Sequence, residues 1–494
     1  MSFFHGVKNT ESPTSIIPPA PCEAAMPVYF GTAPVHRTAS LAKKVNYPII
    51  ANGYDDAVLA LGYDKDWSKW TLSENVYVQF GLFAMSPCVF INVFDPAVHK
   101  TPVATESLTL AAGIGKLVNA DVLLETVVVT DTTGDTTYQK TKDYTLAYDN
   151  DYKAVIARVS TGTIATDTDT LKVTYDYADP SKVDKDDIIG GINVTSGNEE
   201  GLEVIEKVFP ITRKVPGLIV ATGWSDNVEV AAVMASKAWG INGLFKAVAI
   251  VDIPVTGEGA PAQYSAVPEY KNTKNLSDDL QHVLWPMLKL GETEYRYSSQ
   301  FAALIQWTTH YKGKDVPYVS PSNQSLKCDT LIAGAEGSRE EIMLSLTKAN
   351  YLNENGITTA LNWIGGWRAW GNRNACYPAS TDTKDVFLPI RLMFNWVEAQ
   401  FILSFWQKVD GPITRRLVES IIDSFNDRLN GLTAQEAILG GRIEFRKADN
   451  PLSNLLDGKI KFKTYLTPPP PAEEISNDFE LDPDYFDSLF GSTE

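Results

Sequence analysis

Histidine and cysteine are scarce in this chain of 494 residues, which has only five of the first and four of the second. Histidine is the commonest general base near neutral pH and a frequent metal ligand. The five histidines are isolated from one another, and no H-E-x-x-H or G-x-S-x-G motif occurs. The sequence therefore predicts a protein that is not an enzyme, with no catalytic residue, no metal site and no cofactor.

The four cysteines also argue against a metal or redox centre. They lie far apart in the chain, and none of their spacings matches a C-x-x-C motif. They are predicted to be reduced thiols in a protein made in the cytosol, where disulfides are rare.

Basic charge and long apolar runs are also in short supply. The chain has 43 lysines and arginines against 61 aspartates and glutamates, so its formal net charge is −18. Nucleic acids and anionic membranes are bound through clustered Lys and Arg, so neither is an expected partner. No segment approaches the ~20 apolar residues that span a bilayer, and residues 1–15 lack the features of a secretory signal. Direct membrane insertion is therefore not expected.

Segments of different composition follow one another along the chain. Residues 1–26 are rich in proline and serine and are predicted to form an extended N-terminal arm. Residues 27–96 and 187–355 share a β–α–β pattern, which predicts one discontinuous α/β domain. A helix is expected over 227–239, and partial helix over 278–290. Continuous apolar runs predict buried strands at 28–33, 88–94, 218–224 and 245–253.

The segment between the two halves of this domain has a different character. Residues 97–186 are rich in threonine, and short β-prone runs alternate there with Asp, Asn and Gly turns. This pattern predicts an inserted antiparallel β-sandwich or barrel. Residues 97–190 hold 15 acidic and 9 basic residues, a net charge of −6.

Residues 356–466 are predicted to form an α+β domain. A helix over 387–408 is apolar nearly all round, so it is expected to be covered on most sides. Five of the eleven tryptophans lie between 363 and 406, and we interpret them as core rather than as an intersubunit surface. A second helix begins after 410 and ends at Asn430-Gly431. A strand over 459–466 alternates, with one face made by Ile460, Phe462, Thr464 and Leu466.

The chain ends in a segment without regular pattern, residues 467–494. Four prolines at 468–471 stop the preceding strand, and the last 23 residues carry eight acids and no bases among several aromatic residues. This composition predicts a disordered tail that docks on a partner. The whole chain is thus predicted to be a mixed α/β, multidomain protein: an α/β domain with an inserted antiparallel β-domain, and an α+β C-terminal domain, flanked by extended arms.

The C-terminal third resembles the tail sheath proteins of contractile phage tails. Two stretches carry the resemblance, residues 352–358 (LNENGIT) and the W-x-x-W-G-N-R motif at 367–373. The helix GPITRRLVESIIDSFNDRL, the strand GKIKFKTYLTPPPPAEEI and a Ser-Pro-x-Asn segment at 320–323 complete the match. The family motif residues are Trp367, Trp370, Gly371, Asn372 and Arg373. Of these, Arg373 is expected to hydrogen-bond to carbonyl groups or to a carboxylate.

The resemblance implies a structural polymer without catalysis, located in the virion tail and assembled in the bacterial host cytoplasm. Sheath subunits stack in rings around an inner tube, and contraction drives the tube through a bacterial envelope. The implied partners are other sheath subunits, the tail tube protein, and baseplate and tail terminator proteins. The insertion at 97–186 is expected on the outer surface, and the domain at 356–466 is expected to face the tube.

In this family, extended arms knit neighbouring subunits together by adding strands to open sheet edges. His5-Gly6-Val7 is similar to the family's opening strand. The residues expected to form the intersubunit arms and strand are Gly6, Val7, Ile460, Phe462, Thr464 and Leu466. An internal strand remains the alternative for the last four.

Charge suggests a surface for the tube. Residues 356–463 hold 14 basic and 11 acidic residues, a net charge of +3 within an acidic chain. We hypothesise that a charged row on the second helix contacts the tube, with an ordinary solvated helix face as the alternative. This row consists of Arg415, Arg416, Glu419, Asp423 and Asp427.

Other functions are open on the sequence alone. One is the sheath of a secretion or extracellular injection system. Another is a carbohydrate-binding or carbohydrate-acting surface protein, which would need a pair of carboxylates in a cleft. Binding of a nucleotide at the carboxyl ends of the α/β strands has no G-x-G-x-x-G motif to support it.

Overall fold

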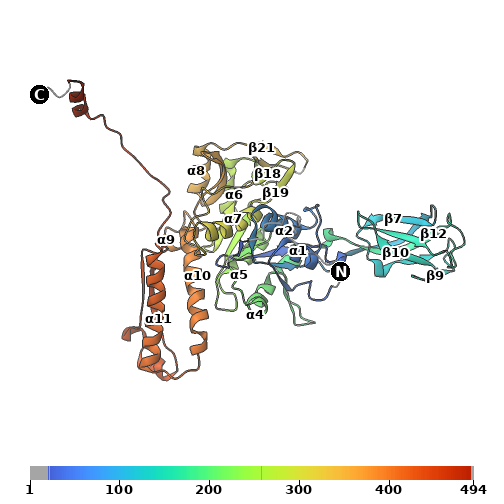
Figure 1. The fold of residues 1–494 in the computed structure, drawn as a ribbon, viewed down its shortest axis with the longest axis horizontal. Helices are drawn as coiled ribbons and strands as arrows, with labels where there is room; N and C mark the ends of the chain where they lie inside the picture. The colour runs from blue at the N-terminus through green and yellow to red at the C-terminus, as the bar shows by residue number, and fades with distance from the viewer. Residues whose placement is uncertain (1–19, 22, 40, 258, 336, 491–494) are drawn as a thin grey trace, which may run out of the picture.

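The structure is a computed structural model that describes residues 20–21, 23–39, 41–257, 259–335 and 337–490. A central α/β body carries a β-sandwich at one end (Figure 1). A pair of long helices and an extended C-terminal segment project from the other end. Within the described part of the chain, every helix is too short or too polar to cross a membrane.

The central body is built on an eight-stranded sheet in the order β23-β22-β17-β16-β15-β2-β5-β3. The six inner strands are parallel, whereas β3 and β23 pair antiparallel at the two edges. Strands β2, β5 and β16 are buried along their whole length, which explains their continuous apolar sequences. The four buried strands predicted from these runs are confirmed. The strand bounds are β2 (Pro27–Gly31), β3 (Pro48–Ala51), β5 (Cys88–Asn92), β15 (Leu218–Val220), β16 (Val248–Asp252), β17 (Gln281–Leu284), β22 (Ile357–Trp363) and β23 (Gly366–Trp370).

Helices α5 (Val228–Ala238) and α7 (Tyr297–Tyr311) both pack on β15 and β16. The predicted helix over 227–239 is confirmed as α5, and Asn227 caps it by accepting hydrogen bonds from the backbone N–H groups of Glu229 and Val230. The body also contains the shorter helices α1 (Tyr54–Leu61), α2 (Thr71–Val76), α4 (Val208–Thr212), α6 (Val267–Thr273) and α8 (Leu346–Glu354).

Two expectations about this body are wrong. Residues 278–290 contain no helix, because β17 is paired on both sides in the central sheet and Pro286 separates it from β18 (Met287–Leu290). Residues 356–370 belong to the central sheet, because β22 pairs with β17 and β23 pairs with β22. The separate C-terminal unit therefore begins later than residue 356. Strand β18 lies in a four-stranded sheet with β19 (Thr293–Tyr295), β20 (Thr330–Ala333) and β21 (Glu340–Ile342).

The inserted segment forms two antiparallel sheets around a core of its own. Their strand orders are β10-β11-β7 and β6-β12-β8-β9. Leu117, Val129, Ile156 and Val173 are among the buried residues between the sheets. The bounds are β6 (Lys100–Thr109), β7 (Ile114–Ala120), β8 (Val128–Thr130), β9 (Thr137–Tyr138), β10 (Tyr144–Tyr148), β11 (Lys153–Arg158) and β12 (Thr170–Ala178).

A buried ion pair joins this β-sandwich to the body. The Arg37 guanidinium donates from Nε and Nη2 to the two carboxylate oxygens of Asp121, at 2.7 and 3.0 Å. The same guanidinium binds Asp64 at 2.6 Å and stacks on the ring of Tyr152, 3.7 Å from its centre. Arginine is suited to such a site because its planar group pairs with a carboxylate and stacks at once. These contacts join the sandwich to the body at Arg37.

The C-terminal unit is a helical hairpin with a two-stranded sheet. Helices α10 (Leu388–Phe405) and α11 (Arg415–Ala434) pack around Met393, Phe425 and Leu429. Strands β24 (Gly440–Glu444) and β25 (Lys463–Thr467) pair antiparallel beside α11. Short helices α9 (Thr383–Val386) and α12 (Leu452–Leu456) complete the unit.

Two expectations for this unit are also corrected. Helix α10 is covered only in its first half, since Leu403 near its end and Trp406 just after it are 42% and 59% exposed. The predicted strand over 459–466 is shorter and shifted, because only residues 463–467 pair with β24. Ile460 and Phe462 precede this strand, whereas Thr464 and Leu466 lie within it.

Two buried carboxylates bind the start of α7. Glu74 accepts hydrogen bonds from the backbone N–H of Arg296 at 2.8 Å and from the Ser299 hydroxyl at 2.6 Å. Asp252, at the end of β16, accepts from the backbone N–H and the hydroxyl of Ser298. Burial raises the pKa of Glu74 to about 7 and that of Asp252 to about 6.

We predict that the isolated protein is more heat-stable at pH 5 than at pH 8, and that Glu74→Gln removes much of this difference. The pKa of Glu74 lies above its ordinary value of 4.5, so the folded protein holds a proton that the unfolded chain has released. This stabilisation is complete below pH 4.5, is lost as the pH rises through 7, and amounts to roughly 3 kcal/mol. Calorimetric Tm values at both pH values measure it.

The exposed Glu292→Gln variant is the control and should keep the wild-type pH dependence. Asp121 does not mask the effect: although burial raises its pKa, hydrogen bonds from His36 and Arg37 hold it below its ordinary value of 3.8. Its contribution is therefore lost only in more acidic solution. Burial lowers the pKa of His282 to about 4, which opposes the Glu74 effect at pH 5, so the variant decides the test: a pH dependence of Tm that Glu74→Gln leaves unchanged contradicts the prediction.

Candidate functional site: surfaces of the C-terminal unit

The place where a sheet of this topology would bind a small molecule is filled by the protein itself. The chain reverses direction across the sheet between β2 and β15, and ligands of open α/β sheets bind at the carboxyl ends of such strands. Here α2 occupies that point. Its Thr71 and Asn75 hydrogen-bond to Thr32 after β2 and to Thr222 after β15. A Cβ on Gly31 would lie only 2.2 Å from the Thr71 hydroxyl.

The family motif lies on β23 and in the loop that follows it. A segment at 323–326 pairs with the outer edge of β23, through hydrogen bonds that join Asn323 and Gln324 to Ala369 and Leu326 to Trp367. The Trp367 indole donates to the Asp329 carbonyl at 2.9 Å. The Ser-Pro-x-Asn segment and the tryptophan motif therefore form one structural unit.

The glycine and asparagine of the motif fix the turn after β23. Gly371 has φ of +141°, and a Cβ there would lie 2.6 Å from the Thr358 hydroxyl, so no other residue fits without strain. Its N–H donates to the Ser322 hydroxyl, and the Asn372 side chain accepts from the Ser320 hydroxyl. Arg373 follows this turn directly.

Arg373 holds the start of the C-terminal arm. Its Nη2 and Nε donate to one carboxylate oxygen of Glu473, at 2.6 and 3.1 Å, and its guanidinium lies 3.9 Å from the centre of the Tyr377 ring. Residues 469–474 line one side of a groove, and Tyr318, Asn350 and Trp370 line the other. We call this the motif groove. Of the two kinds of partner expected for Arg373, carbonyl groups or a carboxylate, the structure has a carboxylate, that of Glu473.

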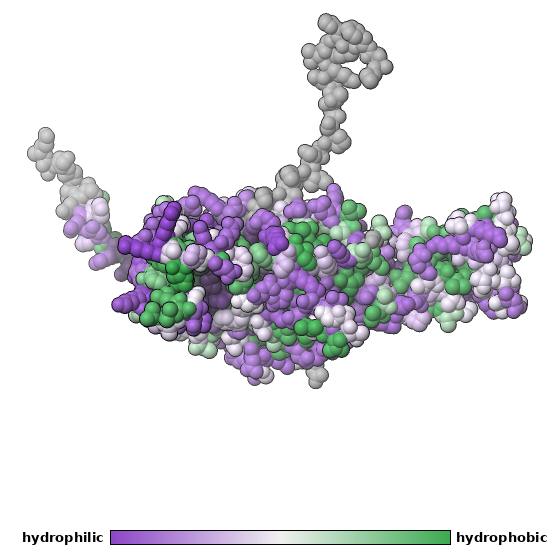
Figure 2. Space-filling view, turned by 90° about the horizontal axis from the view of Figure 1, so that it is seen from below, coloured by the Kyte–Doolittle hydropathy of each residue, from purple (hydrophilic) through white to green (hydrophobic). Residues whose placement is uncertain are grey.

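The tryptophans do not form one core. Trp370 is half-buried, and Trp363 and Trp406 are 58% and 59% exposed, so the expectation of a common core is wrong for these two. Seen from below, apolar residues gather among hydrophilic ones at the hairpin end of the molecule (Figure 2). Trp406, Val409 and Leu456 are exposed there.

The two-stranded sheet β24–β25 lies beside an open apolar groove. Within the described part of the chain, each of its strands pairs only with the other. We call the neighbouring cavity, of about 540 Å³, the β25 groove. Its walls come from α10, from the loop before β16 and from the segment that leads into β25: Phe394, Phe401, Ile402, Leu244, Ile460 and Phe462. Thr464 and Leu466 line it as well. An extended segment laid along β25 would cover these side chains.

All five residues of the charged row lie exposed on α11. Arg415 donates to Glu419 at 2.7 Å, one helical turn away. Asp423 and Asp427 continue the row toward the end of the helix, and among the described residues no ion pair involves Arg416, Asp423 or Asp427. The structure thus brings the row together on one accessible face.

The other predicted arm residues have different fates. Gly6 and Val7 lie outside the described residues. The acidic tail runs away from the body as an extended segment without regular structure, followed by a short 3-10 helix, η9 (Pro483–Phe490) (Figure 1). Phe479, Leu481 and Tyr485 are each more than three-quarters exposed. Reasoning from sequence did not identify Glu473 as the partner of Arg373, since it is one of eight acids in the tail.

Solved structures with the same fold belong to contractile injection systems. The sheath of the extracellular contractile injection system PVC, in its contracted state, matches with a TM-score of 0.55 and 15% identity over 98% of this chain and 99% of that chain. The contracted helical sheath of the anti-feeding prophage matches with a TM-score of 0.54 and 13% identity over 97% and 99%. The chain therefore has the mixed α/β fold of contractile sheath proteins.

Sequence relatives point to phage tails. The tail sheath protein of Burkholderia phage BcepMu is 28% identical over 99% of both chains. A putative prophage major tail sheath protein of Pseudomonas aeruginosa is 26% identical over 58% of this chain and 70% of its own length. No family model matches the sequence. The chain is thus a homologue of phage tail sheath proteins, and the resemblance inferred from the C-terminal motifs is confirmed.

We predict that Arg373→Ala frees the start of the arm without unfolding the protein. An ion pair of this exposure contributes less than about 1 kcal/mol, so the Tm should change little. Because the tail has no basic residue, its release is best followed with a protease that cuts after glutamate. Cleavage at Glu473 and Glu474 should become several-fold faster.

Arg442→Ala is the matched control, because Arg442 also pairs with a nearby glutamate, Glu444, but lies away from the arm. It should leave cleavage of the tail at the wild-type rate. Equal cleavage rates in wild type and Arg373→Ala would show that the pair does not hold the arm.

Proposed function

We propose that this protein is the structural subunit of a contractile phage tail sheath, which polymerises helically around an inner tube and contracts to drive the tube through a bacterial envelope. The full-length match to the BcepMu tail sheath protein carries the proposal. Its work is mechanical rather than catalytic, in keeping with a sheet whose ligand position is filled by α2. It functions in the virion tail, after assembly in the host cytoplasm.

Neighbouring subunits are joined through extended arms. The support is the β24–β25 sheet, whose outer edges are unpaired within the described residues and which lies beside the uncovered half of α10. Backbone N–H and C=O groups on such edges pair with an added strand, and a two-stranded sheet alone is only marginally stable. The N-terminal arm, with Gly6 and Val7, and the C-terminal arm supply these strands. Ile460, Phe462, Thr464 and Leu466 form the receiving surface.

Deletion of residues 1–19 or 475–494 should give a folded monomer that does not polymerise. Both deletions spare the described core, and the second also spares β25 and the Arg373–Glu473 pair. We expect unchanged circular dichroism and a monomeric mass in light scattering, where the full chain forms tubes or rings in electron microscopy. Long tubes from either truncated protein would refute strand exchange by that arm.

The hairpin faces the tail tube. The row Arg415, Arg416, Glu419, Asp423 and Asp427 is exposed along α11, and the hairpin projects from the body (Figure 1). Opposite charges across an interface speed association and fix its orientation. The remaining partners are baseplate and tail terminator proteins at the two ends of the sheath. The β-sandwich lies on the outer surface.

Charge reversal tests the tube contact. Arg415→Glu with Arg416→Glu should reduce co-assembly with the tube at least tenfold, while sheath subunits still associate with one another. Lys65→Glu with Lys142→Glu is the control, since both lysines are exposed elsewhere on the molecule. Sedimentation of tube and sheath at low and high salt measures the effect. Wild-type co-assembly by the α11 variant would remove this surface from the proposal.

A second candidate function is the sheath of an extracellular injection system. The solved structures of the anti-feeding prophage and PVC, which match over nearly the whole chain, favour it. The genes that flank the coding sequence would separate the two, because a phage tail is encoded with capsid and packaging proteins. We favour the phage tail because the sequence relatives are phage and prophage proteins.

A further inference from the structure

The C-terminal unit has two outer faces that point in opposite directions. The apolar stripe of α11, with Ile421, Phe425 and Leu429, packs on a core that also contains Ile443 of β24. This core therefore lies between the helix and the β24–β25 sheet. The far side of the helix and the far side of the sheet are both open to solvent.

The far side of α11 is acidic in the second half of the helix. Asp423 and Asp427 lie two positions after members of the apolar stripe, so the helical period places them opposite it. Both are exposed, and neither forms an ion pair with a described residue. Arg428, next in the sequence, donates instead to Gln400 of α10 at 2.9 Å. We call Asp423 and Asp427 the acidic face.

The far side of the β24–β25 sheet is basic. Tyr465 lies there, with the Arg442 guanidinium 4.0 Å and the Lys463 ammonium 5.1 Å from the centre of its ring. Arg442 is bound to Glu444 at 2.7 Å. Lys461 and Lys463 are exposed, and we call these two lysines the basic face.

The local acids do not neutralise the basic face. Residues 440–463 hold six basic and three acidic residues, a net charge of +3. Each of the three acids pairs with another base of this segment, at distances of 2.5 to 3.7 Å. Three lysines are left without an ion pair among the described residues: Lys447, Lys461 and Lys463.

The spacing of the charges on the two faces is similar. Asp423 and Asp427 are one helical turn apart, which is roughly 6 Å along the axis. Lys461 and Lys463 are two positions apart on an extended segment, which is roughly 6.6 Å. Asn450 holds this segment in place through hydrogen bonds to the backbone N–H and C=O of Lys461, at 2.7 and 2.8 Å. Two carboxylates can therefore meet two ammonium groups at once.

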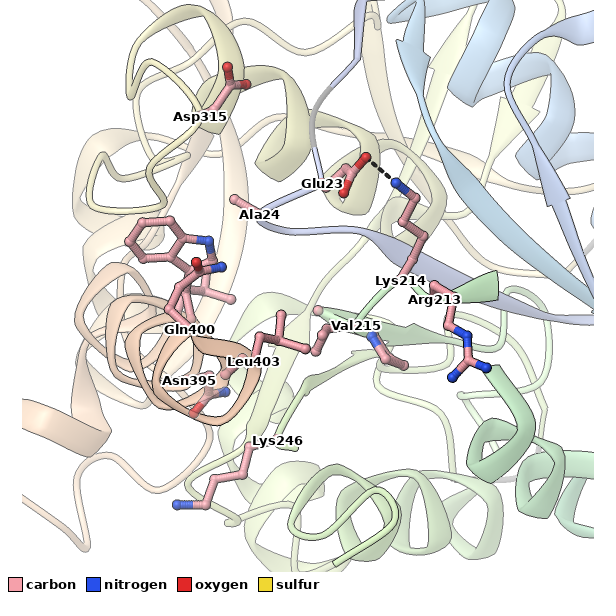
Figure 3. Close-up of a pocket in the computed structure, with 15 residues that line it drawn as sticks. Glu23, Ala24, Arg213, Lys214, Val215, Lys246, Asp315, Asn395, Gln400 and Leu403 are labelled. Carbon is pink, nitrogen blue, oxygen red and sulfur yellow. Dashed lines mark hydrogen bonds and ion pairs between the residues drawn. The ribbon is translucent and has the colours of Figure 1, made fainter. Parts of the chain in front are cut away.

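Charges on the body side of the hairpin, by contrast, are used within the chain. A cavity of about 340 Å³ between α10 and residues 213–217 is lined by charges of both signs: Glu23, Arg213, Lys214, Lys246 and Asp315. All but Arg213 have a partner in the described part of the chain, as the dashed line between Glu23 and Lys214 in Figure 3 illustrates. This cavity offers a partner no set of free charges of one sign.

Opposite charges on opposite faces of one unit meet only between copies. Such a contact is head-to-tail, and head-to-tail contacts generate rings or helical filaments. We propose that Asp423 and Asp427 of one copy pair with Lys461 and Lys463 of a second copy. This inference rests on the proposed sheath function and adds a contact that involves neither arm. It leaves Arg415 and Arg416, in the first turn of α11, for the tube.

Two full-length proteins with reversed charges test the contact. One carries Asp423→Lys with Asp427→Lys, and the other carries Lys461→Glu with Lys463→Glu. In each protein the two faces then have the same sign and repel each other. We expect each protein alone to give at least tenfold less polymer than the wild type at low salt, measured by sedimentation and electron microscopy.

An equimolar mixture of the two proteins should recover the polymer. In the mixture, the α11 face of each protein meets a sheet face of opposite charge on the other, so the two alternate. Mixing would not rescue a folding defect, and unchanged Tm values check this separately. Glu340→Lys with Glu341→Lys is the matched control, because both carboxylates are exposed on β21, outside the C-terminal unit. It should polymerise as the wild type does.

Carbodiimide coupling locates the contact, since it joins a carboxylate and an amine in contact as an amide. Wild-type chains, half of them isotope-labelled, are assembled together and then coupled. Mass spectrometry should find amides between the acidic and basic faces that join a labelled chain to an unlabelled one.

Three outcomes overturn the proposal. They are wild-type yields of polymer from either charge-reversed protein alone, failure of the mixture to recover, and coupling of these residues only within single chains. Electron microscopy separates this inference from the proposed function. Tubes from both charge-reversed proteins refute only this contact, whereas coupling between wild-type copies that never form tubes supports the contact and counts against a sheath.

Discussion

Every backbone N–H and C=O group needs a hydrogen-bond partner. In this molecule that requirement determines how the edges of the sheets are used more than any side-chain contact does. At the β23 edge of the central sheet that need is met internally, since residues 323–326 pair with the outer edge of β23. In the β24–β25 sheet it is not met within the described residues. Among the described sheets, the β24–β25 sheet is a two-stranded one beside an open apolar groove, which favours it as a place for an added strand.

The charge of the chain is also unevenly distributed between its segments. The chain has a net charge of −18, but eight acids lie in the last 23 residues and residues 356–463 are slightly basic. The acidic tail and residues 356–463 therefore carry opposite net charges, although the α10–α11 hairpin itself, residues 388–434, has five basic and five acidic residues. Assembly between copies then draws on both signs, whereas a single chain, with its tail extended, leaves both exposed.

Much of the fold could be predicted because its strands are buried on both faces. A continuous apolar run such as Cys88–Asn92 predicts a strand that is buried on both faces. Asn227 predicts the start of a helix, because its side chain accepts hydrogen bonds from backbone N–H groups of the first turn. The failures have one cause. Residues 278–290 and 356–370 carry ambiguous local signals, and pairing with strands distant in sequence decides their structure.

The candidate site shows the same limit. The Trp-Gly-Asn-Arg motif predicts a turn, because glycine favours one. It also predicts that Arg373 binds carbonyl groups or a carboxylate, because a guanidinium needs hydrogen-bond acceptors. The identity of the partner, Glu473, depends on an arm that returns after 100 residues. The burial of α10 was overestimated for a related reason: its apolar sequence predicts that the helix is covered, but does not show that the rest of this chain leaves its last turns exposed.

Two arginine–carboxylate pairs set the mechanical character of the subunit. Arg37 and Asp121 are largely buried and joined by two hydrogen bonds, and the Arg37 guanidinium also pairs with Asp64, so this contact between the β-sandwich and the body is the stronger of the two. Arg373 and Glu473 are partly exposed and contribute less than about 1 kcal/mol, so the arm can change direction without unfolding anything. A sheath that shortens needs rigid units joined by compliant connections. This chain places strong pairs inside the unit and weak ones at its connections.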